Sequence, residues 1–331
     1  MERFALAAAV VLGFALTAAL CSLFVPLRRV LERREQNQQP AQSEQPRPAP
    51  LRAPLWGGLC AAAGTVAAVG VGWLAACVGQ PELLGSEGRL MTRLLTALAG
   101  SLAFGAVGLA EDLARMRSPA ALGLRRDVRL LLEALAAAFV LLLLRAAGCL
   151  PRGLDVPGAG YVLLGSAVPF LWAVLMVALA ECARIAERDE GTVCGAAFVA
   201  MLALMMAEAG LGVPGLAVLP AALAGALVAL GLWAFPPARL GVGCCGSLLA
   251  AGAIGCIPLS LDMTSLTVPL ALPFWAAGGL WAAQLLGAKR TGKPLRCWVK
   301  KHKMSPETVF LCSFALSAVG YVLALALLRW C

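Results

Sequence analysis

Ten long apolar runs dominate this sequence and constrain its fold more than any other feature. Each is close to the length of about 20 apolar residues that a helix needs to cross ~30 Å of hydrocarbon. The runs occupy residues 4–25, 55–78, 90–110, 129–148, 159–180, 192–209, 214–233, 245–261, 266–286 and 307–328. The sequence therefore predicts an all-α, polytopic membrane protein with about ten transmembrane helices, and a single transmembrane domain over residues 1–331.

The composition agrees with this fold and excludes several classes of protein. Hydrophobic residues make up 61% of the chain and charged residues 14%, whereas soluble domains are about 45–50% apolar and about 25% charged. Ten helices leave no room for a large soluble domain, which excludes a globular catalytic module, a nucleic-acid-binding fold and a disulfide scaffold. Any chemistry must then lie at the ends of membrane helices.

The basic residues are distributed asymmetrically over the two sides of the predicted bundle. The net charge is +9, and 21 of the 27 Lys and Arg residues fall in alternate loops, at 26–54, 111–129, 181–191, 234–244 and 287–306. Because positively charged loops stay in the cytoplasm, we expect a multi-pass protein of the cell membrane with its polar loops cytoplasmic and both termini outside. Within the first of these loops, residues 35–51 are rich in Gln and Pro and predict a flexible linker.

Two neighbouring segments bring carboxylates close to arginines at the end of the third predicted helix. The segments are Gly108-Leu-Ala-Glu111-Asp112-Leu-Ala-Arg115 and Gly123-Leu-Arg-Arg-Asp-Val-Arg129-Leu-Leu-Leu-Glu133. Adjacent carboxylates at a helix end can bind a hard cation or share a proton, and nearby arginines suit phosphate. The alternative is a solvated helix end with ordinary loop charges.

The spacing of these residues resembles the polyprenyl-phosphate N-acetylhexosamine-1-phosphate transferase superfamily, whose members are similar to phospho-N-acetylmuramoyl-pentapeptide transferase. The pattern of that family is Gly, two apolar residues and Asp-Asp, then Gly-Leu, four residues and Lys-Leu-x-x-Gln. Here Glu111 replaces the first Asp and Asp112 keeps the second. Arg129 stands at the Lys position and Glu133 at the Gln position.

Two further segments resemble motifs of the same family at the expected helix ends. Arg52-Ala-Pro-Leu-Trp-Gly57-Gly58 resembles its Pro-x-x-Gly-Gly motif, preceded by a basic residue. Residues 237–248, Pro-Ala-Arg239-Leu-Gly-Val-Gly-Cys244-Cys-Gly246-Ser247-Leu, resemble Pro-Ala-Arg-x-x-x-Gly-Asp-x-Gly-Ser-Leu. The resemblance implies a magnesium ligand at the Asp of this motif, where the chain has Cys244.

The loop after the fifth predicted helix resembles Asn-Ala-x-Asn-Leu-x-Asp-Gly-x-Asp-Gly-Leu of the family. It reads Glu181-Cys-Ala-Arg184-Ile-Ala-Glu187-Arg-Asp-Glu190-Gly-Thr, so both Asn residues are charged and both Asp residues are Glu. The basic loop at 289–305 corresponds to a His-rich region of the family and contains His302. That loop can bind phosphate groups or lie against anionic lipids.

The resemblance implies an enzyme that transfers N-acetylhexosamine-1-phosphate from a UDP-sugar to polyprenyl phosphate at the cytoplasmic face, which initiates cell-wall or surface-glycan synthesis. It implies Mg²⁺ as cofactor and the bilayer, polyprenyl phosphate, a UDP-sugar and a second copy of the chain as partners. The catalytic and metal-binding candidates are Glu111, Asp112 and Glu187, and the substrate-binding candidates are Arg52, Arg129, Arg184, Glu190, Arg239, Gly246, Ser247 and His302.

Three alternatives stand beside this hypothesis. The first is a catalytically impaired homologue that binds lipid phosphate or serves as a membrane partner subunit, because the substitutions fall at positions that the chemistry uses. The second is a zinc site formed by Cys182, Cys244, Cys245, Cys297 and His302. The third is a transporter, although the sequence contains no inverted repeat that favours it.

Overall fold

The computed structural model describes residues 2–38, 56–79, 88–117, 123–151, 153–156, 160–163, 165, 167–187, 191–212, 215–235, 239–286 and 305–328. Its elements are α1 (Glu2–Gln38), α2 (Gly57–Gly79), α4 (Gly88–Arg117), α5 (Arg126–Ala146), β1 (Gly153–Val156), β2 (Gly160–Leu163), α6 (Ala167–Ala186), α7 (Thr192–Gly210), α8 (Val218–Ala234), α9 (Gly243–Leu261), η1 (Thr264–Leu266), α10 (Thr267–Leu270), α11 (Leu272–Leu286) and α13 (Pro306–Leu328). The predicted all-α membrane fold is confirmed.

The described helices account for most of the predicted membrane spans. Seven of them are long and apolar enough to cross a membrane, and an eighth span results if the bent pair formed by residues 264–270 and 272–283 counts as one. Two predicted spans correspond to helices outside this set. α5 contains Arg129, Glu133 and Arg145, and α8 has only 17 residues. The number of ten spans therefore stays a prediction.

Several predicted boundaries are wrong. The run at 159–180 was expected to be one helix, but residues 160–163 pair with β1 in an antiparallel hairpin and α6 begins only at Ala167. Gly160 favours the hairpin over a continuous helix, because its φ of +74° is one that other residues rarely adopt. Three helices extend further than predicted: α1 includes residues 35–38 of the predicted linker, α4 continues to Arg117 and α6 continues to Ala186. The helix predicted at 266–286 is divided into the end of η1, α10 and α11. The rest of the linker lies outside the described residues.

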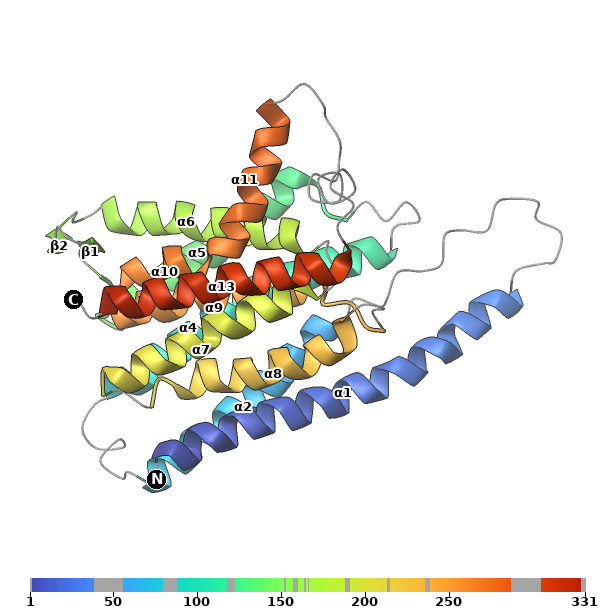
Figure 1. Cartoon of the computed structure of the whole chain (residues 1–331), viewed down its shortest axis with the longest axis horizontal. Helices are drawn as coiled ribbons and strands as arrows, with labels where there is room; N and C mark the ends of the chain where they lie inside the picture. The colour runs from blue at the N-terminus through green and yellow to red at the C-terminus, as the bar shows by residue number, and fades with distance from the viewer. Residues whose placement is uncertain are drawn as a thin grey trace.

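The helices form a bundle in which α9 is the central element. α4 and α9 make the most extensive contact, followed by α1 with α8 and α1 with α2. Figure 1 shows α1, α8, α7 and α13 running alongside one another, while α11 leans away from the bundle after a bend of 64°. The start of α1 and the end of α13 lie at the same end of the bundle (Figure 1).

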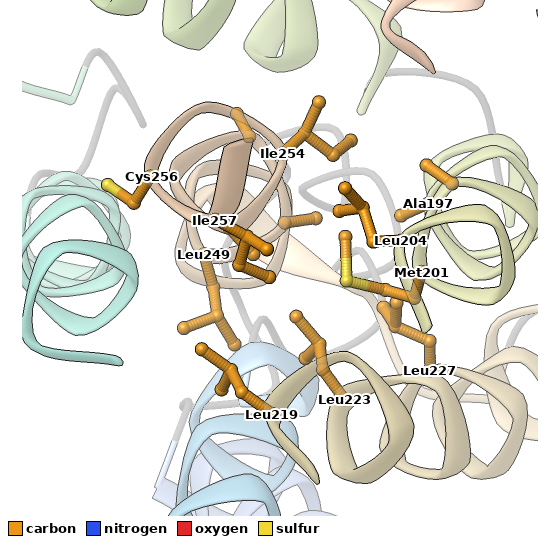
Figure 2. Close-up of a cluster of buried hydrophobic side chains, with 14 of the residues drawn as sticks. Ala197, Met201, Leu204, Leu219, Leu223, Leu227, Leu249, Ile254, Cys256 and Ile257 are labelled. Carbon is orange, nitrogen blue, oxygen red and sulfur yellow. The ribbon is translucent and has the colours of Figure 1, made fainter. Parts of the chain in front are cut away.

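The core lies around α9, whose residues from Gly243 to Ser260 are all buried. Because α9 is apolar on every side, neighbouring helices can enclose it completely without burying an unpaired polar side chain. Figure 2 shows Leu249 and Ile257 of α9 among side chains of the neighbouring helices, namely Met201 and Leu204 of α7 and Leu219, Leu223 and Leu227 of α8. This packing fixes α9 as the element against which the other helices are positioned.

Two glycines allow backbones to meet at the N-terminal end of α9. A Cβ atom on Gly58 of α2 would lie 2.1 Å from the backbone nitrogen of Gly246, and one on Gly108 of α4 would lie 2.2 Å from the carbonyl oxygen of Cys244. Such distances are below any normal contact, so only glycine fits at either position. Small residues have this role in membrane helices. The start of α9 is thereby clamped between α2 and α4.

Replacing Gly58 by Ala should therefore destabilise the protein, because the added methyl group has only immobile backbone to push against. We expect a loss of about 2 kcal/mol or more in the free energy of unfolding. Gly70→Ala on the same helix is the matched control, because a Cβ there meets nothing within 4 Å, and its effect should stay within about 1 kcal/mol. Denaturant unfolding in detergent measures both, and equal stability of the two variants would contradict the clamp.

Candidate active site

The carboxylate of Asp112 binds the first turn of α9. Its Oδ1 accepts a hydrogen bond from the backbone N–H of Cys244 at 3.0 Å, and its Oδ2 accepts one from Cys245 at 2.9 Å. The first N–H groups of a helix have no partner within that helix, and a negative charge is favoured beside them. Val242, the residue before α9, makes no side-chain capping bond. Asp112 of α4 therefore caps α9 from another helix.

The start of α2 joins the same junction through its backbone. The N–H of Gly57 donates to the carbonyl of Gly241 at 3.2 Å, and that of Gly58 donates to the carbonyl of Val242 at 3.0 Å. These bonds satisfy two N–H groups at the start of α2 that would otherwise lack partners. The described parts of three predicted motifs, Gly57 and Gly58, residues 108–115 and residues 239–248, thus meet at one end of the bundle.

Arg115 lies among the three carboxylates that the sequence predicts as metal ligands. Its Nη2 donates to Glu111 Oε1 at 2.6 Å, and its Nη1 lies 3.9 Å from Asp112 Oδ1 and 3.9 Å from Glu187 Oε2. Glu111 and Asp112 are buried, whereas Glu187 follows the end of α6 and is partly exposed. Glu187 also lies 4.0 Å from the Sγ of Cys244. The predicted catalytic residues are therefore brought together as an ion-pair cluster.

A second group of charges adjoins the first. Nε of Arg129 donates to Glu181 Oε1 at 2.8 Å, and the other oxygen of Glu181 accepts a hydrogen bond from Arg184. Arg129 also lies 4.0 Å from Glu133 and 3.8 Å from Glu111, which joins the two groups. Two positions at which the family has Asn thus form an internal ion pair here. Arg129 and Arg184, two of the arginines predicted to bind substrate, therefore already contact carboxylates of the chain.

Several buried atoms of this network have no hydrogen-bond partner within the part of the chain that the structure describes. They are Glu111 Oε2, both carboxylate oxygens of Glu133, and Nε of Arg184. Buried polar groups are normally satisfied by protein or ordered water. Unused donors and acceptors beside the ion pairs are therefore points at which water or a ligand can bind.

Magnesium does not fit the described arrangement of the predicted ligands. Mg²⁺ requires near-octahedral oxygen coordination, yet both oxygens of Asp112 accept backbone hydrogen bonds and Cys244 offers a thiol. Among the described residues, no group of three or more His, Cys, Asp or Glu side chains could hold a metal ion. Two members of the hypothetical zinc site, Cys297 and His302, lie outside the described residues. Binding of either metal stays a prediction.

The structure places some of the remaining site residues and leaves others outside the described ranges. The hydroxyl of Ser247 donates to the carbonyl of Cys244 at 3.1 Å, and Gly246 packs against Gly58, so both shape the start of α9. The backbone N–H of Arg239 donates to the carbonyl of Trp233 at 2.9 Å. The predicted site residues outside the described ranges are Arg52, Glu190 and His302.

The sequence reasoning gave no role to two residues that organise this site. Arg115 joins three carboxylates, and Glu181 holds two arginines. Part of each arrangement is visible in the spacing, because residues three or four positions apart on a helix face the same side. Glu111 and Arg115 have that spacing, as do Glu181 and Arg184. The contacts of Arg115 and Glu181 with residues of other elements follow no such spacing along the sequence.

Comparison with known proteins identifies the family. Residues 94–262 match the family model described as Glycosyl transferase family 4, which is half of the chain. The chain belongs to this family. It is also 31% identical over 170 residues to the phospho-N-acetylmuramoyl-pentapeptide-transferase of Desulforudis audaxviator (strain MP104C), an alignment that covers 48% of this chain and 50% of that protein. The chain spans about half the length of the curated relative it matches.

Membership of Glycosyl transferase family 4 confirms the resemblance on which the site residues were predicted. The matched range includes most of α4 and all of α5, α6, α7, α8 and α9, and with them Asp112, Arg129, Glu187 and Cys244. Arg52 and His302 lie outside it. The roles assigned to individual residues stay predictions, whereas the convergence of Glu111, Asp112, Arg129, Arg184 and Glu187 at one end of the bundle is a structural finding.

Removing the Asp112 carboxylate should destabilise the fold, because two N–H groups of α9 would lose their acceptor. We expect Asp112→Ala to lower the free energy of unfolding by about 2–4 kcal/mol. Asp112→Asn retains one carbonyl acceptor and should lose roughly half as much. Asp127→Ala, on an exposed turn of α5, is the control. If Asp112→Ala were as stable as that control, the capping role would be wrong.

Proposed function

We propose that this protein transfers a sugar-1-phosphate from a UDP-sugar to polyprenyl phosphate at the cytoplasmic face of the membrane. The observation that carries the proposal is the convergence of four family motifs, far apart in the sequence, at one end of the bundle. Asp112 contacts Cys244 and Cys245, Arg129 contacts Glu181, and Gly58 packs against Gly246. The name of the matched relative, a phospho-N-acetylmuramoyl-pentapeptide-transferase, supports the same reaction class.

The proposed reaction exchanges one phosphorus–oxygen bond for another. A phosphate oxygen of the polyprenyl phosphate attacks the β-phosphorus of the UDP-sugar. The bond from that phosphorus to the bridging oxygen breaks, and UMP leaves with the bonding electron pair. The products are a lipid-linked pyrophosphoryl sugar and UMP. We propose an N-acetylhexosamine as the sugar and the start of cell-wall or surface-glycan synthesis as the role.

The charged residues of the site supply positioning and charge stabilisation for this transfer. Phosphoryl transfer depends on cations that neutralise and orient the phosphates. Arg115, Arg129 and Arg184 lie within one network. To hold a phosphate, Arg129 and Arg184 must share or exchange their contacts with Glu181, which lowers the affinity that the same arginines would have without that carboxylate.

This competition favours a second candidate, in which the chain binds a lipid phosphate but turns over slowly or not at all. The specific observations are the internal pairing of Arg129 and Arg184 with Glu181 and the thiol of Cys244 at the position of a magnesium ligand. A protein of this kind would act as a lipid-phosphate-binding subunit of a membrane assembly.

Release of UMP from a UDP-N-acetylhexosamine, with undecaprenyl phosphate as acceptor, separates the two candidates. The purified chain should release UMP in detergent. Glu187→Gln should reduce the rate by roughly 100-fold, as expected for loss of a charged group in the site. Glu307→Gln, on an exposed position of α13, should leave the rate unchanged.

The D. audaxviator relative, assayed alongside with UDP-N-acetylmuramoyl-pentapeptide as the donor, controls for the lipid acceptor and the detergent, and the chain is assayed with both UDP-sugars. If that enzyme works and the chain releases no UMP, transferase activity is ruled out. Saturable binding of undecaprenyl phosphate by the inactive chain would then support the second candidate.

A further inference from the structure

Arg115 occupies the centre of a carboxylate cluster that, by the sequence, should surround a metal ion. Its guanidinium group lies 2.6 Å from Glu111 and 3.9 Å from both Asp112 and Glu187. These are the three residues predicted as magnesium ligands. A single cationic side chain thus contacts the whole predicted ligand set.

The same carboxylates cannot serve both cations in this arrangement. Mg²⁺ needs oxygen ligands at about 2.0–2.1 Å in near-octahedral geometry, which a guanidinium group between the ligands prevents. Asp112 has both oxygens in hydrogen bonds to the backbone of α9, and Cys244 presents sulfur in place of an oxygen ligand. The negative charge of these carboxylates, which a divalent ion would otherwise neutralise, is therefore compensated by groups of the protein itself.

We propose that Arg115 is a built-in cation that replaces the divalent metal ion at this site, so that the site is assembled without bound magnesium. An arginine suits this role because its guanidinium group stays charged and presents five N–H donors in a planar fork. Arg129 adds a second positive charge, 3.8 Å from the same oxygen of Glu111 that binds Arg115. Arg115 is thus the nearer cation to Glu111, and Arg129 divides its charge between Glu111 and its closer partner Glu181.

The position of Arg115 also makes it available to a ligand. Its side chain is 22% exposed, whereas that of Glu111 is 3% exposed and that of Asp112 is 1% exposed. The guanidinium group lies between buried carboxylates and solvent, with the partly exposed Glu187 on one side. It can therefore contact an incoming phosphate while it still neutralises the carboxylates. This last step rests on the proposed function, but the replacement of the metal does not.

Divalent-cation binding by the purified full-length chain tests the proposal. The wild-type protein should bind no stoichiometric Mn²⁺, measured by electron paramagnetic resonance. Its melting temperature should be the same in MgCl₂ as in NaCl of equal ionic strength, which controls for screening. One Mn²⁺ bound per wild-type chain would overturn the proposal.

Removal of the guanidinium group should create the metal dependence that the wild type lacks. Arg115→Ala leaves the buried carboxylates uncompensated and should lower the melting temperature by more than about 5 °C. Mg²⁺ should then restore part of this loss, and Mn²⁺ should bind. Arg115→Lys should stay insensitive to metal, because it retains the charge. Arg117→Ala, at an exposed position on the same helix, is the matched control.

The outcomes separate this proposal from the proposed function. Stability of Arg115→Ala equal to that of Arg117→Ala would overturn the role of Arg115. If Arg115→Ala cannot be purified, Mn²⁺ binding by the wild type and by Arg115→Lys decides. Release of UMP only in the presence of Mg²⁺ would refute the metal replacement and leave the transferase standing. Absence of UMP release would refute the transferase activity, and the metal-binding measurements would still decide whether Arg115 replaces the metal ion.

Discussion

The hydrogen bonds from two α9 amides to the Asp112 carboxylate are the interaction on which the rest of this site depends. A helix that is buried along almost its whole length, as α9 is, cannot leave its first N–H groups to water. Asp112 supplies the missing acceptors from α4, and Gly58 and Gly108 let α2 and α4 approach closely enough. The same contacts bring together motifs that lie more than a hundred residues apart in the chain.

The ion pairs follow from placing charged residues at this buried junction. An unpaired charge is costly away from water, so each one needs a partner. Glu181 and Arg184 stand where the family has two Asn residues and satisfy one another, with Arg129 as a second partner for Glu181. The substitutions at these two Asn positions are thus mutually compensating. This pairing explains how the fold tolerates the two charged residues. It also means that a phosphate ligand must compete with Glu181 for the arginines.

The sequence predicted the membrane fold and most of the helices because their apolar length is a local property. It also placed Glu111, Asp112 and Glu187 in one site, through the resemblance of its motifs to those of the family. It missed the hairpin at residues 153–163, where local glycines outweigh hydropathy, and it missed that α4 continues past Glu111 to Arg117. The capping role of Asp112 and the central place of Arg115 depend on contacts between helices, which no spacing along the chain encodes.

Amide hydrogen exchange at the start of α9 tests the role of Asp112 most directly. The amides of Cys244 and Cys245 should exchange slowly in the wild-type protein and at least about tenfold faster in Asp112→Ala, because the loss of ~1.4 kcal/mol corresponds to a factor of ten. Amides in the middle of α9, such as Ile254, report the loss of global stability with which this change is compared. Equal exchange of Cys244 and Cys245 in the two proteins would show that Asp112 does not hold α9.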